Sequence, residues 1–243
     1  GSPTASSGPH SLQIEAQVRA PDAALAFELL GDAVRRPTFP ADELALLRTQ
    51  TLSALQLERS QPDAIASRHF ARQLYGDHPY GRRATRETVQ GITRDDLVAF
   101  HQARLRPSGS LLVIAGALSL DEARRLAEAA LGGWTGAAPT AVAMPAPPAP
   151  STTRILLVHR PGSVQSNVVA GNLTFPPTSQ LRYATTMANH VLGGGADARL
   201  FLILREEKGW TYGAYSSLTS PKGTGSFQAG TEVRTEVTDS ALS

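Results

Sequence analysis

Hydrophobic residues recur along the first half of this chain with two different periods, and the period predicts the secondary structure. Leu12, Ile14, Ala16 and Val18 alternate with polar residues, which is typical of a half-buried strand. Further on, apolar residues return every three or four positions, which is the period of an amphipathic helix. This second period predicts helices near residues 22–35, 41–60, 62–74, 93–105 and 121–131.

Capping residues and breakers set the ends of these helices. Asp22 is a suitable first cap, and Pro37 ends the helix that follows it. Thr93 opens the fourth helix, with Asp95 and Asp96 in a first turn that favours negative charge. We therefore expect a helix-rich first half.

The second half contains more strands than helices. The continuous apolar run at residues 111–116 predicts a buried strand. We expect a helix at 180–192 and another at 198–208, the second ended by Gly209. Four further strands are predicted at 154–158, 165–174, 212–220 and 226–235.

Composition divides the chain into four stretches. Residues 1–10 are small and polar, so we expect a tag-like, disordered tail outside the fold. Residues 137–153 are rich in Ala and Pro, which is typical of a semi-rigid extended linker. The tail and the linker leave two structured pieces, 11–136 and 154–243.

A nine-residue segment occurs twice. Residues 11–19 read SLQIEAQVR and residues 226–234 read SFQAGTEVR, with four of nine positions identical. Each copy leads into a D-x-A-L sequence, at 22–25 and at 239–242. A strand that leads into a helix is therefore written twice, which indicates a protein built of two repeats. We expect this chain to begin midway through the first repeat and to end midway through the second.

Composition and charge exclude several classes of protein. Hydrophobic residues make up 41% of 243 residues, which is enough for a sizeable core. The formal net charge is only +2 and no basic run is long, so we expect no nucleic-acid partner. No apolar run reaches membrane-spanning length, so we expect no membrane contact. Cysteine is absent, which excludes disulfides and thiolate sites and leaves the compartment open.

One segment carries a specific resemblance. Residues 192–216 read LGGGADARLFLILREEKGWTYGAYS, which resembles the second-repeat signature of the M16 metallopeptidases (pitrilysin, insulysin and the mitochondrial processing peptidase). Ala198 stands where the family usually has Ser, and Trp210 where it usually has Leu. HPYG at 78–81 and ITRDDL at 92–97 resemble the end of the family's first repeat. The resemblance covers residues 11–243 in order.

The resemblance implies an α+β fold in which helices pack on one face of a mixed sheet. The two pieces would then be the second half of one repeat and the first half of the next. Together they would form one domain in permuted order and share a single sheet. Since the chain carries two candidates for one strand position, one copy would lie at an edge, where it could pair with a second chain.

The resemblance also implies a zinc site, and this sequence departs from it. Active members bind Zn²⁺ through H-x-x-E-H, with the Glu as general base and a further Glu ligand on the next long helix. None of the six His residues here belongs to such a motif. Alignment through Pro40 and Pro62 places Leu47 and Ala54 at the family's two downstream Glu positions. Glu43 and Glu58 lie one turn out of register, so we expect no cofactor in this chain.

The same signature retains Arg205 and Tyr212, which match the family's substrate-orienting Arg/Tyr pair. A guanidinium and a phenol can both donate hydrogen bonds to a peptide carbonyl. The alternative is that Arg205 pairs with a neighbour on its helix and Tyr212 packs in its strand. For His78, a structural role in a turn stands against a role as a ligand.

These observations lead to an expected function. The chain would be the non-catalytic half of an M16-type peptidase, orienting a peptide substrate for a zinc-bearing partner subunit. Two alternatives remain: a purely structural, peptidase-derived subunit, and an active zinc metalloendopeptidase whose H-x-x-E-H segment lies outside this sequence. A strand-exchanged homodimer is a further expected association. We expect a bacterial protein, with the periplasm as one candidate compartment.

Overall fold

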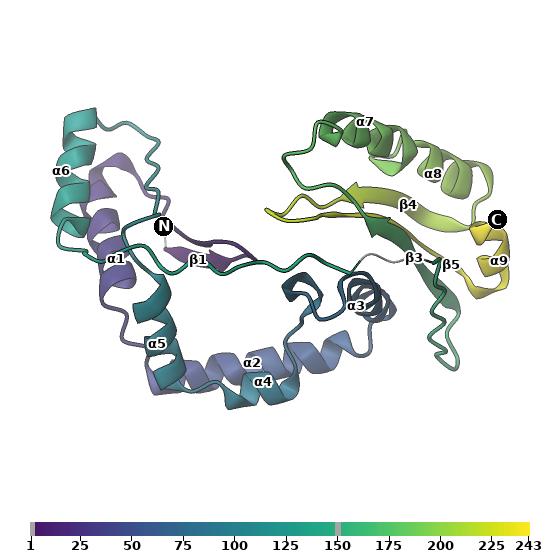
Figure 1. Ribbon diagram of the computed structural model, residues 1–243, viewed down its shortest axis with the longest axis horizontal. Helices are drawn as coiled ribbons and strands as arrows, with labels where there is room; N and C mark the ends of the chain where they lie inside the picture. Colours follow the sequence, from purple (N-terminus) through teal and green to yellow (C-terminus); the bar gives the residue numbers. More distant parts are fainter. Residues whose placement is uncertain (1–2, 149–151) are drawn as a thin grey trace. The chain divides into compact units, whose positions relative to one another are not determined.

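Stretches that lie far apart in the sequence come together in each of two units. The computed structural model describes residues 3–148 and 152–243. The first unit holds the chain up to Leu52 and Arg86–Ala143, and the second holds Ser53–Thr85 and Met144–Ser243. Helices and antiparallel strands both occur, so the fold is α+β, as the sequence predicts (Figure 1).

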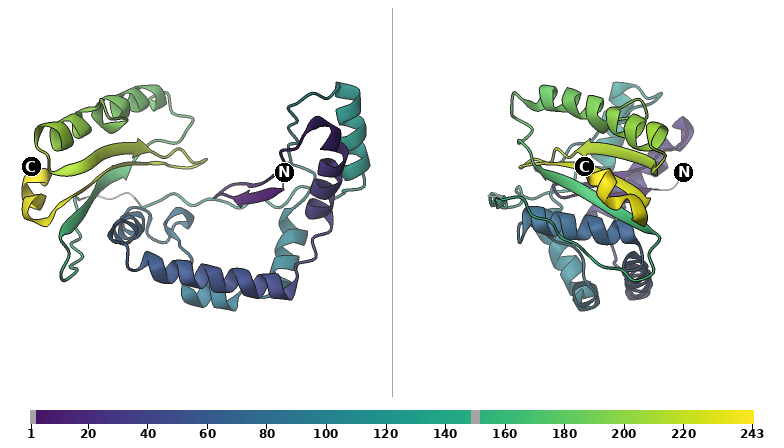
Figure 2. Two further views of the ribbon diagram at one scale, coloured as in Figure 1. Left: turned by 180° about the vertical axis from the view of Figure 1, so that it is seen from behind. Right: turned by 90° about the vertical axis from the view of Figure 1, so that its right-hand side faces the viewer.

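Two helices form the core of the first unit. Helices α1 (Ala23–Arg35) and α6 (Leu120–Leu131) pack side by side (Figure 2). A glycine is required at position 31, because a Cβ atom there would lie 2.7 Å from the carbonyl oxygen of Ala130. Arg35 Nη1 donates to that oxygen at 2.9 Å. The buried cluster consists of Ala23, Phe27 and Leu126, with Leu118, Ala127 and Ala130 packed against it.

A reciprocal cap starts helix α5 (Arg94–Arg104) at the residue that the sequence predicts. The Thr93 hydroxyl accepts from Asp96 N at 3.2 Å, and Asp96 Oδ2 accepts from Thr93 N at 2.8 Å. Asp96 Oδ2 also accepts from the Thr93 hydroxyl at 2.7 Å. These hydrogen bonds hold the pKa of the Asp96 carboxyl below its ordinary value. The hydrogen bond with the Thr93 side chain has the larger effect, and that with the Thr93 backbone the smaller.

The first ten residues do not all lie outside the fold. Thr4–Ser7 form strand β1, which pairs antiparallel with β2 (Leu12–Glu15). The prediction of a disordered tail over residues 1–10 is therefore wrong for β1. Pairing with β2 gives the backbone of this small polar segment hydrogen-bond partners that composition does not reveal. The predicted strand at 12–18 is shorter than expected and ends at Glu15.

Helix α2 (Ala41–Glu58) has an apolar stripe that stays open. None of its residues is buried, and Leu47 is exposed. Arg48 Nη2 donates to the carbonyl oxygen of Ile92, just after the short helix α4 (Arg86–Gly91).

Within residues 3–148 and 152–243, no helix is both long and apolar enough to cross a membrane.

The second unit is built on a three-stranded sheet. Strand β5 (Ser226–Arg234) lies between β3 (Gln165–Leu173) and β4 (Thr211–Leu218), and both pairings are antiparallel. Helix α7 (Arg182–Gly193) and α8 (Arg199–Phe201) lie over one face of the sheet (Figure 1). Helix α3 (Pro62–Tyr75), from the first half of the sequence, packs against β3.

An aromatic cluster joins α3 to the β4–β5 hairpin. Tyr80, in the turn η2 (Pro79–Gly81), accepts from Gly223 N at 3.0 Å through its hydroxyl. The buried His78 accepts from Tyr80 N at Nδ1, so its Nε2 carries the proton and donates to Pro145 O at 2.9 Å. His78 therefore has the structural role, and it holds Pro145 within the second unit.

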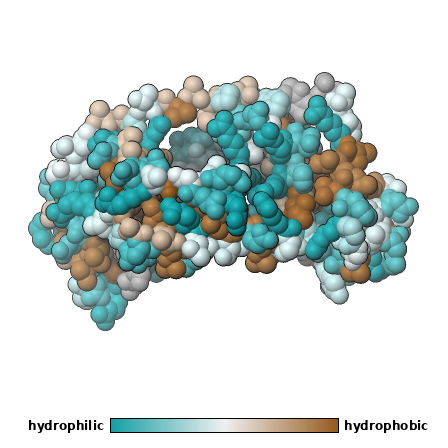
Figure 3. Space-filling model, turned by 90° about the horizontal axis from the view of Figure 1, so that it is seen from below, coloured by the Kyte–Doolittle hydropathy of each residue, from teal (hydrophilic) through white to brown (hydrophobic). Residues whose placement is uncertain are grey.

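The two pieces do not share one sheet, and two predicted strands are absent. The described strands form a two-stranded and a three-stranded sheet, so the single-sheet prediction is wrong. Residues 111–116 and 154–158 lie outside helices and strands, with Leu111 86% and Ile155 94% exposed. An apolar run forms a strand only where a neighbouring strand hydrogen-bonds to its backbone N–H and C=O groups. No described segment pairs in this way with 111–116 or with 154–158. Hydrophobic patches are also visible on the face in Figure 3.

The duplicated segment has the local structure that the sequence predicts. The first copy forms β2 and leads through η1 (Ala20–Asp22) into α1. The second copy forms β5 and leads through η4 (Thr235–Val237) into α9 (Thr238–Leu242). Their surroundings differ, because β5 pairs on both edges whereas β1 is the only described strand that pairs with β2.

The Thr93 cap gives a prediction on stability. We expect Thr93→Ala to lower the free energy of unfolding by about 0.5–2 kcal/mol at neutral pH, because the start of α5 loses its cap. The lowered pKa of Asp96 means that its contribution is present above its unfolded pKa and is lost as the pH falls through the folded value. Urea denaturation across this range should therefore show the difference between parent and variant shrinking in acid.

A neighbouring acid supplies the control. Asp95→Asn removes a negative charge from the first turn of α5 but leaves the reciprocal hydrogen bonds between Thr93 and Asp96 intact. It should cost less than Thr93→Ala. An equal cost, or a Thr93→Ala difference that stays constant into acid, would contradict the assignment.

Candidate functional site

Arg205 and Tyr212 lie on either side of one turn in the second unit. Arg205 lies in η3 (Leu202–Glu207), a π-helical segment that continues directly from α8. The sequence predicts an ordinary helix over 198–208, whereas Lys208 N donates to Ile203 O at 3.0 Å, five residues back. π-Helical turns are rare and concentrate at functional sites.

Two neighbours hold the Arg205 guanidinium, and both lie on its own helix. Arg205 Nη1 donates to Glu206 Oε1 at 2.5 Å, and the Cζ atom lies over the Phe201 ring at 5.1 Å from its centroid. The expected alternative, in which Arg205 pairs with a helix neighbour, is therefore realised at one nitrogen. The side chain is still 43% exposed, and a guanidinium carries five N–H donors.

Tyr212 projects into solvent from the start of β4. The residue is 88% exposed, and in the described part of the chain its hydroxyl has no hydrogen-bond partner. The alternative in which Tyr212 packs in its strand is thus wrong. An exposed phenol and an exposed guanidinium can each donate a hydrogen bond to a carbonyl group.

A β-bulge explains why Tyr212 points outward. The register between β4 and β5 shifts between Thr211 and Ala214, so Tyr212 and Gly213 lie in the irregular stretch. The Thr211 hydroxyl accepts from Gly213 N at 3.0 Å, and the Thr231 hydroxyl donates to Gly213 O at 3.1 Å. Bulges re-aim side chains, and here hydroxyl groups from both strands fix the backbone of the bulge.

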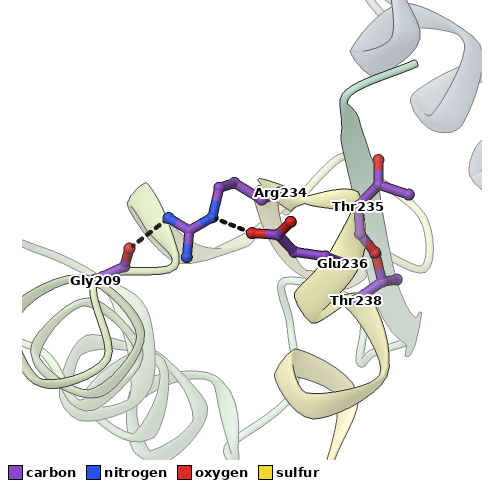
Figure 4. A network of polar contacts seen from close by, with 5 residues as sticks. All are labelled: Gly209, Arg234, Thr235, Glu236 and Thr238. Atoms are coloured by element: carbon purple, nitrogen blue, oxygen red, sulfur yellow. Dashed lines mark hydrogen bonds and ion pairs between the residues drawn. The ribbon is translucent and has the colours of Figure 1, made fainter. Parts of the chain in front are cut away.

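A glycine and an arginine shape the turn between η3 and β4. Gly209 has a φ of +64°, the left-handed conformation that favours glycine and ends a helix. Arg234, the last residue of β5, donates from Nη1 to Gly209 O at 3.2 Å (Figure 4). Arg234 Nε donates to Glu236 Oε1 at 3.0 Å, which orients the guanidinium. The turn is therefore anchored to the central strand of the sheet.

The structure places the two candidate residues on one anchored turn without joining them. No hydrogen bond or ring contact links Arg205 to Tyr212 among the described residues. Both side chains therefore remain available to a third group. A peptide carbonyl is the simplest ligand for two such donors.

The side chains that could ligate a metal are scattered over the residues that the structure describes. Across residues 3–148 and 152–243, no three His, Cys, Asp or Glu side chains come together as a metal site. Leu47 and Ala54 are exposed on α2 and have no ligand atoms. Glu58 pairs with Arg68 at 3.4 Å.

The sequence alone did not identify the residues that support the candidate pair. Phe201, Thr231 and Arg234 each contact the turn or one of its two candidate side chains. Arg234 was visible as one of the four identical positions of the duplicated segment. Its counterpart Arg19 also pairs with a nearby acid, Asp22, at 3.0 Å. The duplication was therefore a usable signal for Arg234.

Known proteins resemble this chain over most of its length. A zinc protease of Mycobacterium leprae, described as uncharacterized, is 31% identical over 204 residues, covering 81% of this chain and 45% of the relative. A similar zinc protease of Bacillus subtilis is 24% identical over 202 residues, covering 82% of this chain and 48% of the relative. The chain thus spans about half the length of the curated relatives it matches.

Solved structures agree in fold. A crystal structure of a peptidase M16 inactive domain from Pseudomonas fluorescens superimposes with a TM-score of 0.81 at 27% identity, covering 95% of this chain and 56% of that one. A protease from Helicobacter pylori gives 0.83 at 16% identity, covering 99% and 60%. The family model described as the peptidase M16 inactive domain matches residues 91–243. The chain therefore belongs to the peptidase M16 family, and most of its length corresponds to the family's inactive domain.

Proposed function

We propose that this chain is a non-catalytic part of an M16-type peptidase that orients a peptide substrate. Arg205 and Tyr212 donate hydrogen bonds to the carbonyl groups of the peptide, and a zinc-bearing partner subunit supplies the metal. The observation that carries the proposal is the display of both donors from one anchored turn, with the Tyr212 hydroxyl unpaired within the described residues.

The chemistry of the two donors suits a peptide bond near a metal. A guanidinium stays charged at all relevant pH values and can donate more than one hydrogen bond to a carbonyl oxygen. A tyrosine hydroxyl adds a neutral donor. Donors fixed in advance opposite a metal would hold the scissile bond in place and stabilise the oxyanion that develops on attack by water.

The names of relatives support a protease-related role over a purely structural one. The curated relatives are named zinc proteases, and the solved neighbours include a periplasmic protease from Escherichia coli. A purely structural subunit has no need for exposed Arg and Tyr donors on an anchored turn. An active zinc peptidase would need ligands that Leu47 and Ala54 cannot provide.

Peptide binding is the direct test. We expect a fluorescein-labelled, unstructured peptide from β-casein to bind the chain saturably, measured by fluorescence anisotropy. Arg205→Ala should weaken this binding roughly tenfold or more, because a charge-assisted hydrogen bond is lost. Tyr212→Phe should weaken it about two- to tenfold, because a neutral hydrogen bond is lost.

Matched variants separate the site from general effects of charge and aromatic surface. Arg199→Ala removes a positive charge from α8, and Tyr183→Phe removes a hydroxyl from an exposed tyrosine on α7. Neither should change peptide affinity by more than about twofold. No saturable binding by the parent, or equal affinities for the parent and Arg205→Ala, would contradict the proposal and favour the structural alternative.

Zinc content is a second prediction. We expect the purified chain to hold far less than one zinc ion per molecule and to cleave no casein by itself, because it lacks H-x-x-E-H and has Leu47 and Ala54 where ligands would be needed. Metal analysis after gel filtration measures the content, with an active zinc protease run in parallel. About one tightly held zinc that disappears in His69→Ala or His78→Ala would overturn this expectation.

Self-association is a third prediction, and it concerns β2. The edge of β2 opposite β1 pairs with no described strand, and Leu12 on this strand is exposed. Since a free strand edge tends to recruit another chain, we propose a homodimer through this edge, including exchange of the terminal strands. Equilibrium sedimentation should show a dimer that is lost on deletion of residues 1–19 or in Leu12→Lys. Arg205→Ala should leave it unchanged, and a strictly monomeric parent would end the proposal.

A further inference from the structure

Phe201 lies directly beneath the guanidinium of Arg205. The Arg205 Cζ atom is 5.1 Å from the centroid of the Phe201 ring, within the range of a cation–π interaction. Phe201 is only 9% exposed, whereas the Arg205 side chain is about half open. A fixed ring therefore supports a charge that faces solvent on its other side.

The ring itself is held from the sheet. The centroids of Phe201 and Tyr215 are 5.6 Å apart with the rings tilted by 45°, so a residue of β4 packs against Phe201. The ring is thus in contact both with Arg205 and with the strand that carries Tyr212. Phe201 is the last residue of α8, and the π-helical turn begins immediately after it.

The contacts around Arg205 divide its surface into engaged and open parts. Glu206 accepts a hydrogen bond from one guanidinium nitrogen at 2.5 Å, and the Arg205 Cζ atom lies over the Phe201 ring. In the part of the chain that the structure describes, the Arg205 guanidinium has no other hydrogen-bond partner. The donors left over are those that a substrate carbonyl would use. A flexible arginine side chain would lose rotational freedom about several bonds when it binds a substrate. Prior support by a ring reduces this entropic cost.

We propose that Phe201 is a positioning residue, which holds the Arg205 guanidinium in the orientation that receives a peptide carbonyl. This inference rests on the proposed function of Arg205. The competing explanation is that Phe201 only fills space between α8 and β4. The two explanations differ in one respect: positioning depends on the aromatic face and on the presence of Arg205, whereas packing depends on volume.

A double-mutant cycle separates the two explanations. Phe201→Leu keeps an apolar side chain but removes the ring face, and we expect it to weaken binding of the labelled β-casein peptide about two- to fivefold. Phe201→Tyr keeps the ring and should stay within about twofold of the parent. In the Arg205→Ala background, Phe201→Leu should have no further effect. Phe227→Leu, the same change on β5, is the matched control and should leave affinity unchanged.

NMR spectroscopy supplies a measurement that does not depend on peptide binding. The ring current of Phe201 should shift the Arg205 Nε–H proton upfield in the parent and in Phe201→Tyr, and the shift should disappear in Phe201→Leu. Thermal unfolding of each variant checks that the chain remains folded. If Phe201→Leu does not fold, the Phe201→Tyr and parent spectra still report whether the ring faces the guanidinium, and an unshifted Arg205 proton overturns the inference.

The outcomes distinguish this inference from the proposed function. If Arg205→Ala does not weaken binding, the proposed function fails, and the positioning role fails with it. If Arg205→Ala weakens binding but Phe201→Leu does not, only the positioning role fails. If Phe201→Leu weakens binding equally with and without Arg205, Phe201 is a packing residue. Weakening that requires Arg205, together with the lost ring-current shift, supports the inference.

Discussion

The pairing of β5 on both of its edges is the interaction on which the second unit depends. This strand hydrogen-bonds to β3 along one edge and to β4 along the other, and Val233 near its end is fully buried. The same strand supplies Thr231 to the bulge and Arg234 to the turn. A central strand is the most constrained part of a small sheet, so residues attached to it are held more firmly than residues on a loop.

Local signals predicted most of the helices and the three strands of this sheet. Thr93 marks the start of α5, because capping is a matter of a few neighbouring residues. Asp22 stands directly before α1 as predicted, but its carboxylate pairs with Arg19 and makes no capping hydrogen bond. The prediction failed where a partner decides the outcome. The runs at 111–116 and 154–158 have the composition of strands, but composition cannot supply the neighbouring backbone that a strand needs. The π-helix and the bulge were also not predicted, since both depend on tertiary contacts.

The sequence predicted which residues form the candidate site, but it did not predict how their side chains are arranged. The motif identified Arg205 and Tyr212, and the structure adds how each is presented: one over a buried ring, the other on a bulge. The helix-neighbour alternative for Arg205 was partly right, because Glu206 does engage it. Arg205 can pair with Glu206 through one guanidinium nitrogen and still donate to a ligand through the others. The two alternatives drawn from the sequence are therefore compatible with each other.

The π-helical turn has a consequence for how such a site can be lost. A turn closed by an i to i+5 hydrogen bond holds one residue more than an α-helical turn. Deleting one of the three residues between Phe201 and Arg205 would restore the α-helical spacing and rotate the residues after the deletion by about 100° relative to those before it. Arg205 would then follow Phe201 by three positions instead of four, and its side chain would start from a point about 100° away around the helix axis, with nearly every residue of the motif still present. In a relative of this chain, the orientation of the arginine therefore depends on the length of the π-helical segment as well as on the identity of its residues.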